Sequence, residues 1–175
     1  ENLTHLLQVT PEKLRPQLFG ERPVAEALVA ETGDGKSGGD TLAALVRKFG
    51  VDAGTLAIPA QIYHDTGSWG ITKIGAGTLA LSGNNIYTGA TVINSGTLTV
   101  SGGAAIINTG AVSLADTAGA VFNLTTSETI GSLAGGGATG GNVSLGASTL
   151  TTGDANTSTT YAGVISGAGG ALVKT

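Results

Sequence analysis

The sequence predicts a mostly β fold, a right-handed parallel β-helix over about residues 70–175, preceded by a small, mainly helical N-terminal segment. Two observations lead to this prediction. The composition changes near Trp69, and a glycine-bounded heptapeptide returns after 19 residues. With 175 residues, 41% of them hydrophobic, the chain is long enough to bury a core.

The change in composition separates two regions of the chain. Residues 1–69 contain all 4 Pro and fifteen of the twenty charged residues, whereas residues 70–175 contain 22 of the 30 Gly and only five charged residues. We expect 1–69 to be a short-helix segment that caps the solenoid, and 70–175 to be a repeat segment that continues beyond the C-terminus. The start at Glu1 indicates a processed product or an excised fragment.

The repeat decides the architecture. Gly77–Gly83 and Gly96–Gly102 share five of seven residues, and in each, apolar residues alternate with Thr, Ser or Ala. Alternation of this kind is typical of half-buried strands. About five coils of stacked strands explain the return of the heptapeptide, whereas a β-sandwich or an up-and-down barrel does not. The residues expected to point inward are Leu79, Leu81, Ile93, Leu98, Val100, Val112, Leu114, Phe122, Leu124, Ile130, Leu133, Val143, Leu145 and Leu150.

A longer spacing is also present. The segment 70–73 (Gly-Ile-Thr-Lys) is similar to the segment 171–174 (Ala-Leu-Val-Lys), about 101 residues later. We therefore expect a second long repeat to begin at the C-terminal end of the chain.

The N-terminal region has the features of short helices. Thr10-Pro11-Glu12 is a suitable helix start. From Asp40 to Gly50, apolar residues recur with helical spacing, basic residues occupy the last turn and a glycine follows. For Pro23–Ala30, helix and strand remain equally open.

Residues 71–100 carry a family resemblance. Lys73 precedes a glycine-rich turn, a first Gly-Thr-Leu strand, an Asn/Tyr/Thr/Gly corner at 84–89 and a second Gly-Thr-Leu strand at 96–100. This order closely resembles the autotransporter-associated β-strand repeat, and residues 129–135 and 161–167 are similar to its continuation. The resemblance implies a passenger domain of a Gram-negative type V secreted protein. It would be a non-catalytic structural or adhesive segment at the cell surface, attached to the outer membrane through a region outside this chain.

Composition excludes several classes of function. Without Cys, the chain has no disulfide scaffold, Cys-ligated zinc or redox thiol. The net charge of −4 argues against a nucleic-acid partner, and no apolar run approaches the ~18 residues of a membrane span. Asp116, Glu128 and Asp154 lack the regular spacing of calcium-binding repeats, so we interpret them as solvated corner residues. No metal or cofactor is expected.

An enzyme is not expected either. The five charged residues of 70–175 do not pair by spacing, and this region has no His. The pattern Ala30-x4-Gly35-Lys36-Ser37 matches a loose phosphate loop, but Gly38 and Gly39 follow where a helix should continue, so a flexible loop is preferred. His5 and His64 are interpreted as surface or packing residues. The alternative is a chain that carries, or lies beside, a secreted enzyme domain.

A third class of function is a cell-wall glycan-binding module. Residues 39–56 resemble part of a LysM module, although the amphipathic helix expected there explains the same residues. As partners we expect host or surface glycans, or neighbouring β-helix repeats.

Overall fold

The computed structural model describes residues 47–63 and 68–175, which form strands and no helix. Accordingly, these residues contain no helix with the length and hydropathy needed to cross a membrane. The strands are β1 (Arg47–Gly50), β2 (Thr55–Ile58), β3 (Ile71–Ile74), β4 (Thr78–Leu81), β5 (Thr91–Ile93), β6 (Thr97–Val100), β7 (Ala111–Leu114), β8 (Val121–Leu124), β9 (Glu128–Ile130), β10 (Ser132–Gly135), β11 (Asn142–Ser144), β12 (Thr149–Thr152), β13 (Ile165–Ser166) and β14 (Ala171–Lys174).

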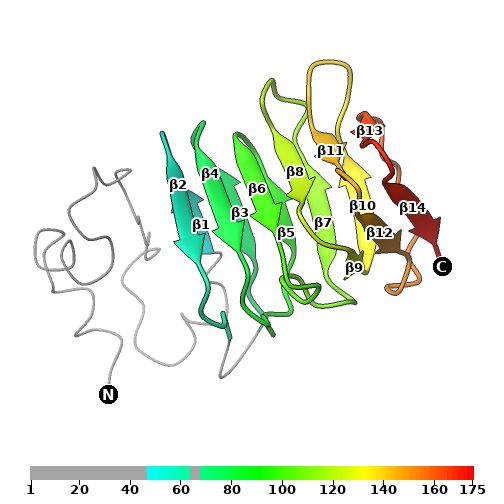
Figure 1. Ribbon diagram of the computed structural model, residues 1–175, viewed down its shortest axis with the longest axis horizontal. Helices are drawn as coiled ribbons and strands as arrows, with labels where there is room; N and C mark the ends of the chain where they lie inside the picture. The colour runs from blue at the N-terminus through cyan, green and yellow to red at the C-terminus, as the bar shows by residue number, and fades with distance from the viewer. Residues whose placement is uncertain (1–46, 64–67) are drawn as a thin grey trace, which may run out of the picture.

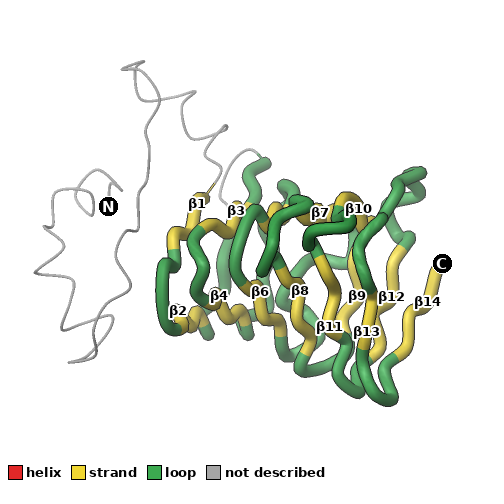
Figure 2. The backbone as a smooth tube through the Cα atoms, turned by 90° about the horizontal axis from the view of Figure 1, so that it is seen from above, coloured by secondary structure: helices red, strands yellow, loops and turns green. Residues whose placement is uncertain are grey.

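The strands form three parallel sheets. The first sheet has the order β1-β3-β5-β7-β10, the second β13-β11-β8-β6-β4-β2, and the third β14-β12-β9. Neighbours in each sheet come from successive passes of the chain, so the backbone coils into a parallel β-solenoid (Figures 1 and 2). Each of the six strands of the second sheet belongs to one coil, and we number the coils 1 to 6 from β2 to β13. The right-handed sense of the coil stays a prediction.

The register of the second sheet explains the sequence repeat. Leu79 pairs with Leu98, so the return of the heptapeptide after 19 residues is one coil. One inward column of this sheet consists of Leu56, Leu79, Leu98, Phe122, Val143 and Ile165. All fourteen residues predicted to point inward are buried, which confirms the prediction of the core.

The prediction for the N-terminal segment is wrong where the structure describes it. Residues 47–50, expected to end a helix, form β1, which pairs with β3, and β2 pairs with β4. The solenoid therefore begins by Arg47 and not near residue 70. Phe49 and Val51 are buried in this first coil, so packing against coil 2 overrides the local helical spacing. The remaining helix predictions, and residues 1–46 of the proposed cap over 1–69, fall outside those described.

The two segments related by the long spacing lie on different sides of the coil. Ile71–Ile74 is β3 of the first sheet, whereas Ala171–Lys174 is β14 of the third sheet and pairs with β12. In β3, Ile71 and Lys73 are buried, whereas all of β14 is exposed at the C-terminal end. Leu172 pairs with the buried Leu150, so it points inward as Ile71 does, although the two segments lie in different sheets.

Candidate functional site

Two of the charged residues have local structural roles. The Asp116 Oδ1 atom accepts hydrogen bonds from the backbone N–H groups of Thr139 (2.7 Å) and Gly140 (2.9 Å). Asp154 accepts one from the Thr175 hydroxyl at 3.2 Å. Among the described residues, no three His, Cys, Asp or Glu side chains gather in a group that could hold a metal ion.

Glu128 is not the solvated corner residue that the sequence suggests. It lies in β9 with only 2% of its surface exposed. Its Oε1 atom accepts a hydrogen bond from the Ile106 N–H at 3.1 Å, whereas its Oε2 atom has no hydrogen-bond partner. Burial raises the pKa of this carboxyl above its usual value, against the opposing effect of the backbone N–H groups of Ile106 and Ala105.

Lys73 joins two coils. Its fully buried ammonium donates to the carbonyl oxygens of Ile74 (2.8 Å) and Gly75 (2.7 Å) in its own coil, and to that of Ser95 (3.0 Å) in the next. These three acceptors match the three protons of an ammonium. Burial lowers the pKa of Lys73, and the nearby Asp52 carboxylate opposes that shift.

A glycine corner makes room for this ammonium. Gly96 has φ +65°, and a Cβ atom there would lie 2.6 Å from the Lys73 Nζ. Both the backbone conformation and the close approach therefore require glycine at this position. The lysine and the glycine one coil later form a single contact across the stack.

Asn85 lies on the third side of coil 2, the segment that connects β4 of the second sheet to β5 of the first. Its side chain is 3% exposed, and it accepts from the Ile62 N–H at 2.7 Å and donates to the Ala105 carbonyl at 2.7 Å. Because Ile62 and Ala105 belong to the preceding and following coils, one amide bonds in both directions along the axis. It adds to the backbone hydrogen bonds that join the coils here, from the Asn85 N–H to the Ala104 carbonyl and from the Ile86 N–H to the Ile62 carbonyl.

Tyr87 and Thr91 form a second buried polar contact, between the third side of coil 2 and β5 of coil 3. Their hydroxyl oxygens lie 2.7 Å apart and both residues are fully buried. The ring of Tyr87 stacks on Trp69 with centroids 6.4 Å apart and an interplanar angle of 14°. Burial raises the pKa of Tyr87 to about 12, although its bond to Thr91 acts in the opposite direction.

Sequence reasoning did not identify these buried polar residues, because the segment 84–89 was interpreted only as a corner. A signal was present. From Asn85 to Thr88, buried and exposed residues alternate, with Asn85 and Tyr87 inside. The period of two therefore continues through the corner, with polar residues at positions that apolar ones occupy elsewhere.

The outer face of the second sheet is a candidate binding surface. Its two columns consist of Thr55, Thr78, Thr97, Val121 and Asn142, and of Ala57, Ala80, Thr99, Asn123, Ser144 and Ser166. None of these side chains is charged, and most carry a hydroxyl or an amide. At about 4.8 Å per strand, the two columns form a regular polar face roughly 24 Å long.

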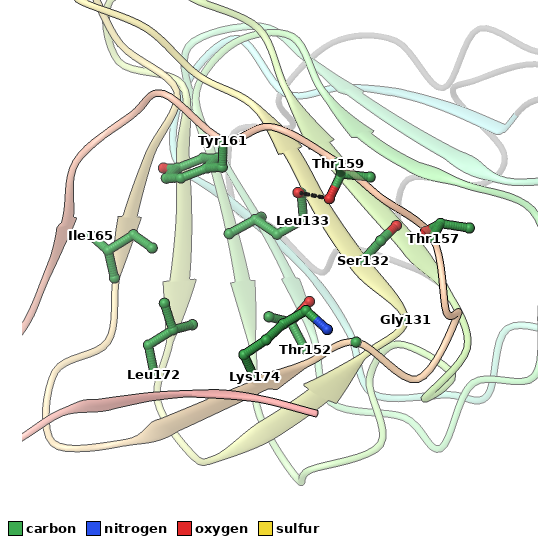
Figure 3. A pocket seen from close by; sticks show the side chains of 11 residues that line it. Gly131, Ser132, Leu133, Thr152, Thr157, Thr159, Tyr161, Ile165, Leu172 and Lys174 are labelled. Atoms are coloured by element: carbon green, nitrogen blue, oxygen red, sulfur yellow. Dashed lines mark hydrogen bonds between the residues drawn. The ribbon is translucent and has the colours of Figure 1, made fainter.

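A hollow lies at the C-terminal end of the solenoid (Figure 3). It has a volume of about 270 Å³, and apolar side chains of Leu133, Ile165 and Leu172 line it together with Tyr161 and Lys174. The Tyr161 hydroxyl donates to the Gly141 carbonyl at 2.6 Å, which fixes one wall. The hollow contains no pair of charged side chains that could act as acid and base.

The other sequence candidates lie wholly or partly outside the described residues. The phosphate-loop pattern at 30–37, His5 and His64 fall on residues outside those described. Of the LysM-like stretch 39–56, the described part forms β1 and the start of β2, and not the amphipathic helix expected there. These two strands lie in different sheets of the solenoid, so their backbone groups serve coil stacking.

Comparison with known proteins identifies the class of this solenoid. Residues 71–100, which span β3 to β6, match the family Passenger-associated-transport-repeat. This segment is therefore an autotransporter passenger repeat, and the resemblance stated from the sequence is confirmed.

A particular relative extends the match. Over 119 residues, 67% of this chain, the sequence is 41% identical to the adhesin BmaC autotransporter of Brucella suis biovar 1 (strain 1330). The matched stretch spans 3% of the length of that protein. No solved structure matches the chain.

Proposed function

We propose that this chain is a passenger segment of a Gram-negative autotransporter-type surface protein, where it serves as a non-catalytic stalk with an adhesive face. The passenger repeat at 71–100, the relative named as an adhesin and the parallel β-solenoid support this function. The proposed location is extracellular, at the cell surface, with attachment to the outer membrane through a region outside this chain.

The uncharged face of the second sheet is the observation on which the adhesive role depends. Hydroxyl or amide groups occur there at least once per coil, and Asn123 already donates to the Thr99 hydroxyl at 3.4 Å. Such groups suit weak, repeated hydrogen bonds to the hydroxyls of glycans. A face without Lys or Arg does not suit nucleic acid. Host or surface glycans are the partners that we propose.

A non-catalytic role agrees with the use of the charged groups. Lys73 and Asp116 are engaged by backbone atoms, and Glu128 is enclosed in the core. An acid–base mechanism requires such groups to face a substrate together, and these three are held by the backbone or the core instead. Neither an enzyme carrier nor a cell-wall glycan module is favoured over the stalk.

Glycan-array binding of the chain tests the proposal. We expect Thr99→Lys and Asn123→Lys, which place a charged side chain on the face, to lower apparent affinity several-fold. Ser113→Lys is the matched control, because Ser113 is a half-buried outward residue of the first sheet. Absence of glycan binding, or equal loss in all three variants, would contradict the adhesive role of this face.

A further inference from the structure

We infer that the outer surface of coils 1 and 2 on their third side is a glycan subsite, where the ring of Tyr63 stacks on the C–H face of a pyranose sugar. This surface, which we call the Tyr63 patch, consists of Gln61, Tyr63, Ser68, Asn84, Ile86 and Thr88. The subsite deepens the proposed adhesive function, on which it rests for the class of partner. It places an aromatic contact on a side of the solenoid other than the second sheet.

Tyr63 and Ile86 are the apolar centre of the patch. Tyr63 is 60% exposed and Ile86 is 44% exposed. Apart from three residues near the C-terminal end, they are the exposed large hydrophobic residues in the part of the chain that the structure describes. Their neighbours Ile62 and Asn85 are buried, so alternation directs Tyr63 and Ile86 outward. Their exposure follows from this direction and not from a position at an end of the stack.

Tyr63 and Ile86 lie side by side on neighbouring coils. The Ile86 N–H donates to the Ile62 carbonyl at 3.0 Å. In the second sheet, the Thr97 N–H donates in the same way to the residue before Thr78, and these two threonines are partners in the sheet. By this parallel register Ile86 is opposite Tyr63, about 4.8 Å along the axis. An aromatic and an aliphatic side chain thus share one exposed surface.

Amide groups lie on one flank of this centre. Gln61 and Asn84 precede Tyr63 and Ile86 by two residues, and both are exposed. The Gln61 Nε2 donates to the Asn84 backbone carbonyl at 2.6 Å, which holds this side chain against the next coil and leaves its oxygen as an acceptor. The side-chain amide of Asn84 offers both donors and an acceptor.

Hydroxyl groups lie on the other flank. Thr88 follows Ile86 by two residues and is exposed, as is Ser68 of coil 1. The Thr88 hydroxyl donates to the Ser68 hydroxyl at 3.2 Å, and the Ser68 hydroxyl can still donate its own proton. The patch therefore has an apolar centre between two uncharged polar flanks.

The backbone under the patch is fixed by the buried amide of Asn85. Its side chain accepts from the Ile62 N–H and donates to the Ala105 carbonyl, each at 2.7 Å. Tyr63 and Ile86 directly follow these anchored residues, so they are presented on a rigid support. Because a tyrosine side chain also has few torsions to restrict, the entropic cost of binding through it is low.

A pyranose sugar matches this pattern of groups. Its faces carry C–H groups and its rim carries hydroxyls. The face of an aromatic ring is partly negative, so it attracts the weakly positive hydrogens of C–H groups. Amides and hydroxyls on the flanks can bond to the hydroxyls of the rim. None of the side chains of the patch is charged, so a charged ligand finds no counter-charge in it.

Saturation-transfer NMR with methyl β-D-glucopyranoside tests the subsite. Both faces of this sugar carry only C–H groups, and a titration to about 100 mM detects a Kd of roughly tens of millimolar. We expect saturation of the protein's aromatic protons to reach the C–H protons of the sugar. Tyr63→Ser should reduce this transfer about fivefold, because the stacking partner is lost. Tyr63→Phe should retain it, because the ring face remains.

Val164→Ser is the matched control, because Val164 is also 60% exposed and lies outside the patch. It should leave the transfer unchanged. Absence of transfer from the parent chain, or equal transfer from Tyr63→Ser and Tyr63→Phe, would overturn the subsite. So would a dimer of the parent that Tyr63→Ser converts to a monomer in sedimentation, because a second copy of the chain would then occupy the patch.

The glycan array keeps this result apart from the adhesive role of the second sheet. Transfer that depends on Tyr63, without retention of the chain on any array glycan, would support the subsite and contradict adhesion through the sheet. Array binding that Thr99→Lys lowers, together with no transfer that depends on Tyr63, would contradict the subsite alone.

Discussion

Coils 2 and 3 close their third side differently from coils 4 and 5. In coils 2 and 3, residues 82–90 and 101–110 form no strand, and side chains such as Asn85 bond to backbone atoms across the coils. In coils 4 and 5, β9 and β12 form the third sheet and pair directly. On this side of coil 2, a side-chain amide therefore adds to a few backbone hydrogen bonds between coils, where coils 4 and 5 have paired strands.

This use of side chains concentrates stability in single residues. The buried polar residues of coil 2 include Lys73 and Asn85, and each bonds to the backbone of the next coil. In coils 4 and 5, the hydrogen bonds between coils on this side are instead distributed along the backbones of β9 and β12. We expect one substitution to damage coil 2 more than coil 5.

The largest effect is expected for Asn85→Ala. The variant leaves the Ile62 N–H and the Ala105 carbonyl without their side-chain partner, which should lower the free energy of unfolding by about 2–4 kcal/mol. Urea denaturation followed by the fluorescence of Trp69, the one tryptophan, measures it. Asn84→Ala is the control, because Asn84 is exposed beside it. Similar losses of stability in both variants would contradict the role of the Asn85 side chain in joining neighbouring coils.

Lys73→Met should have a smaller effect, about 1–3 kcal/mol. The Ile74 carbonyl keeps its bond from the Val51 N–H, and the Gly75 carbonyl keeps only a long one from the Ser95 hydroxyl (3.4 Å), so the main loss falls on the Gly75 and Ser95 carbonyls. Removal of a buried charge offsets part of that loss. Denaturation of this variant beside Lys174→Met checks the prediction, since Lys174 is exposed. A Lys73→Met variant as stable as the parent would show that coils 2 and 3 do not depend on this contact.

Tyr87→Phe should cost about 1 kcal/mol near neutral pH, because the Thr91 hydroxyl loses its partner. The variant should also resist alkali better. The pKa of Tyr87 is raised from 10.0 to about 12, so the folded chain holds a proton that the unfolded chain releases. Stability from this group is present below pH 10 and is lost as the pH rises towards 12. Denaturation midpoints from pH 9 to 12 should fall less steeply in the Phe variant, and parallel curves would exclude this linkage.

The smallest effect, and one of opposite sign, is expected in coil 4 for Glu128→Gln. Its raised pKa means that the folded chain binds the proton more tightly, so stability is highest below pH 4.5 and falls as the pH rises through the folded pKa. The neutral amide should therefore stabilise the chain at pH 7 by on the order of 1 kcal/mol. Denaturation at pH 4 and pH 7 measures the difference. A variant that is less stable at both values would contradict the assignment.

The sequence predicts the apolar part of the solenoid well, for a physical reason. Inward Leu, Ile and Val residues alternate with Thr and Ser, and the repeat returns once per coil, so local pattern and tertiary packing agree. Leu79 and Leu98 are the clearest case, since they match in sequence and pair in the sheet.

The buried polar residues were not predictable in the same way. Lys73 and Glu128 are inside because backbone groups from another coil need partners there, and the local sequence does not contain that information. Phe49 is a different case. The apolar residues around it have helical spacing, but the segment forms β1, because it pairs with β3 and buries Phe49 in the core. The outward columns of the second sheet could not be predicted either, because the pairing register decides which residues of successive coils lie side by side.

The uncharged columns of the second sheet have a consequence for where attachment can occur. Thr97, Thr99 and Asn123 bring no ion pairs to a partner, so the strength of contact through them should not depend on ionic strength. A cell that attaches to a surface through the proposed adhesive face would therefore stay attached over a wide range of salt concentrations.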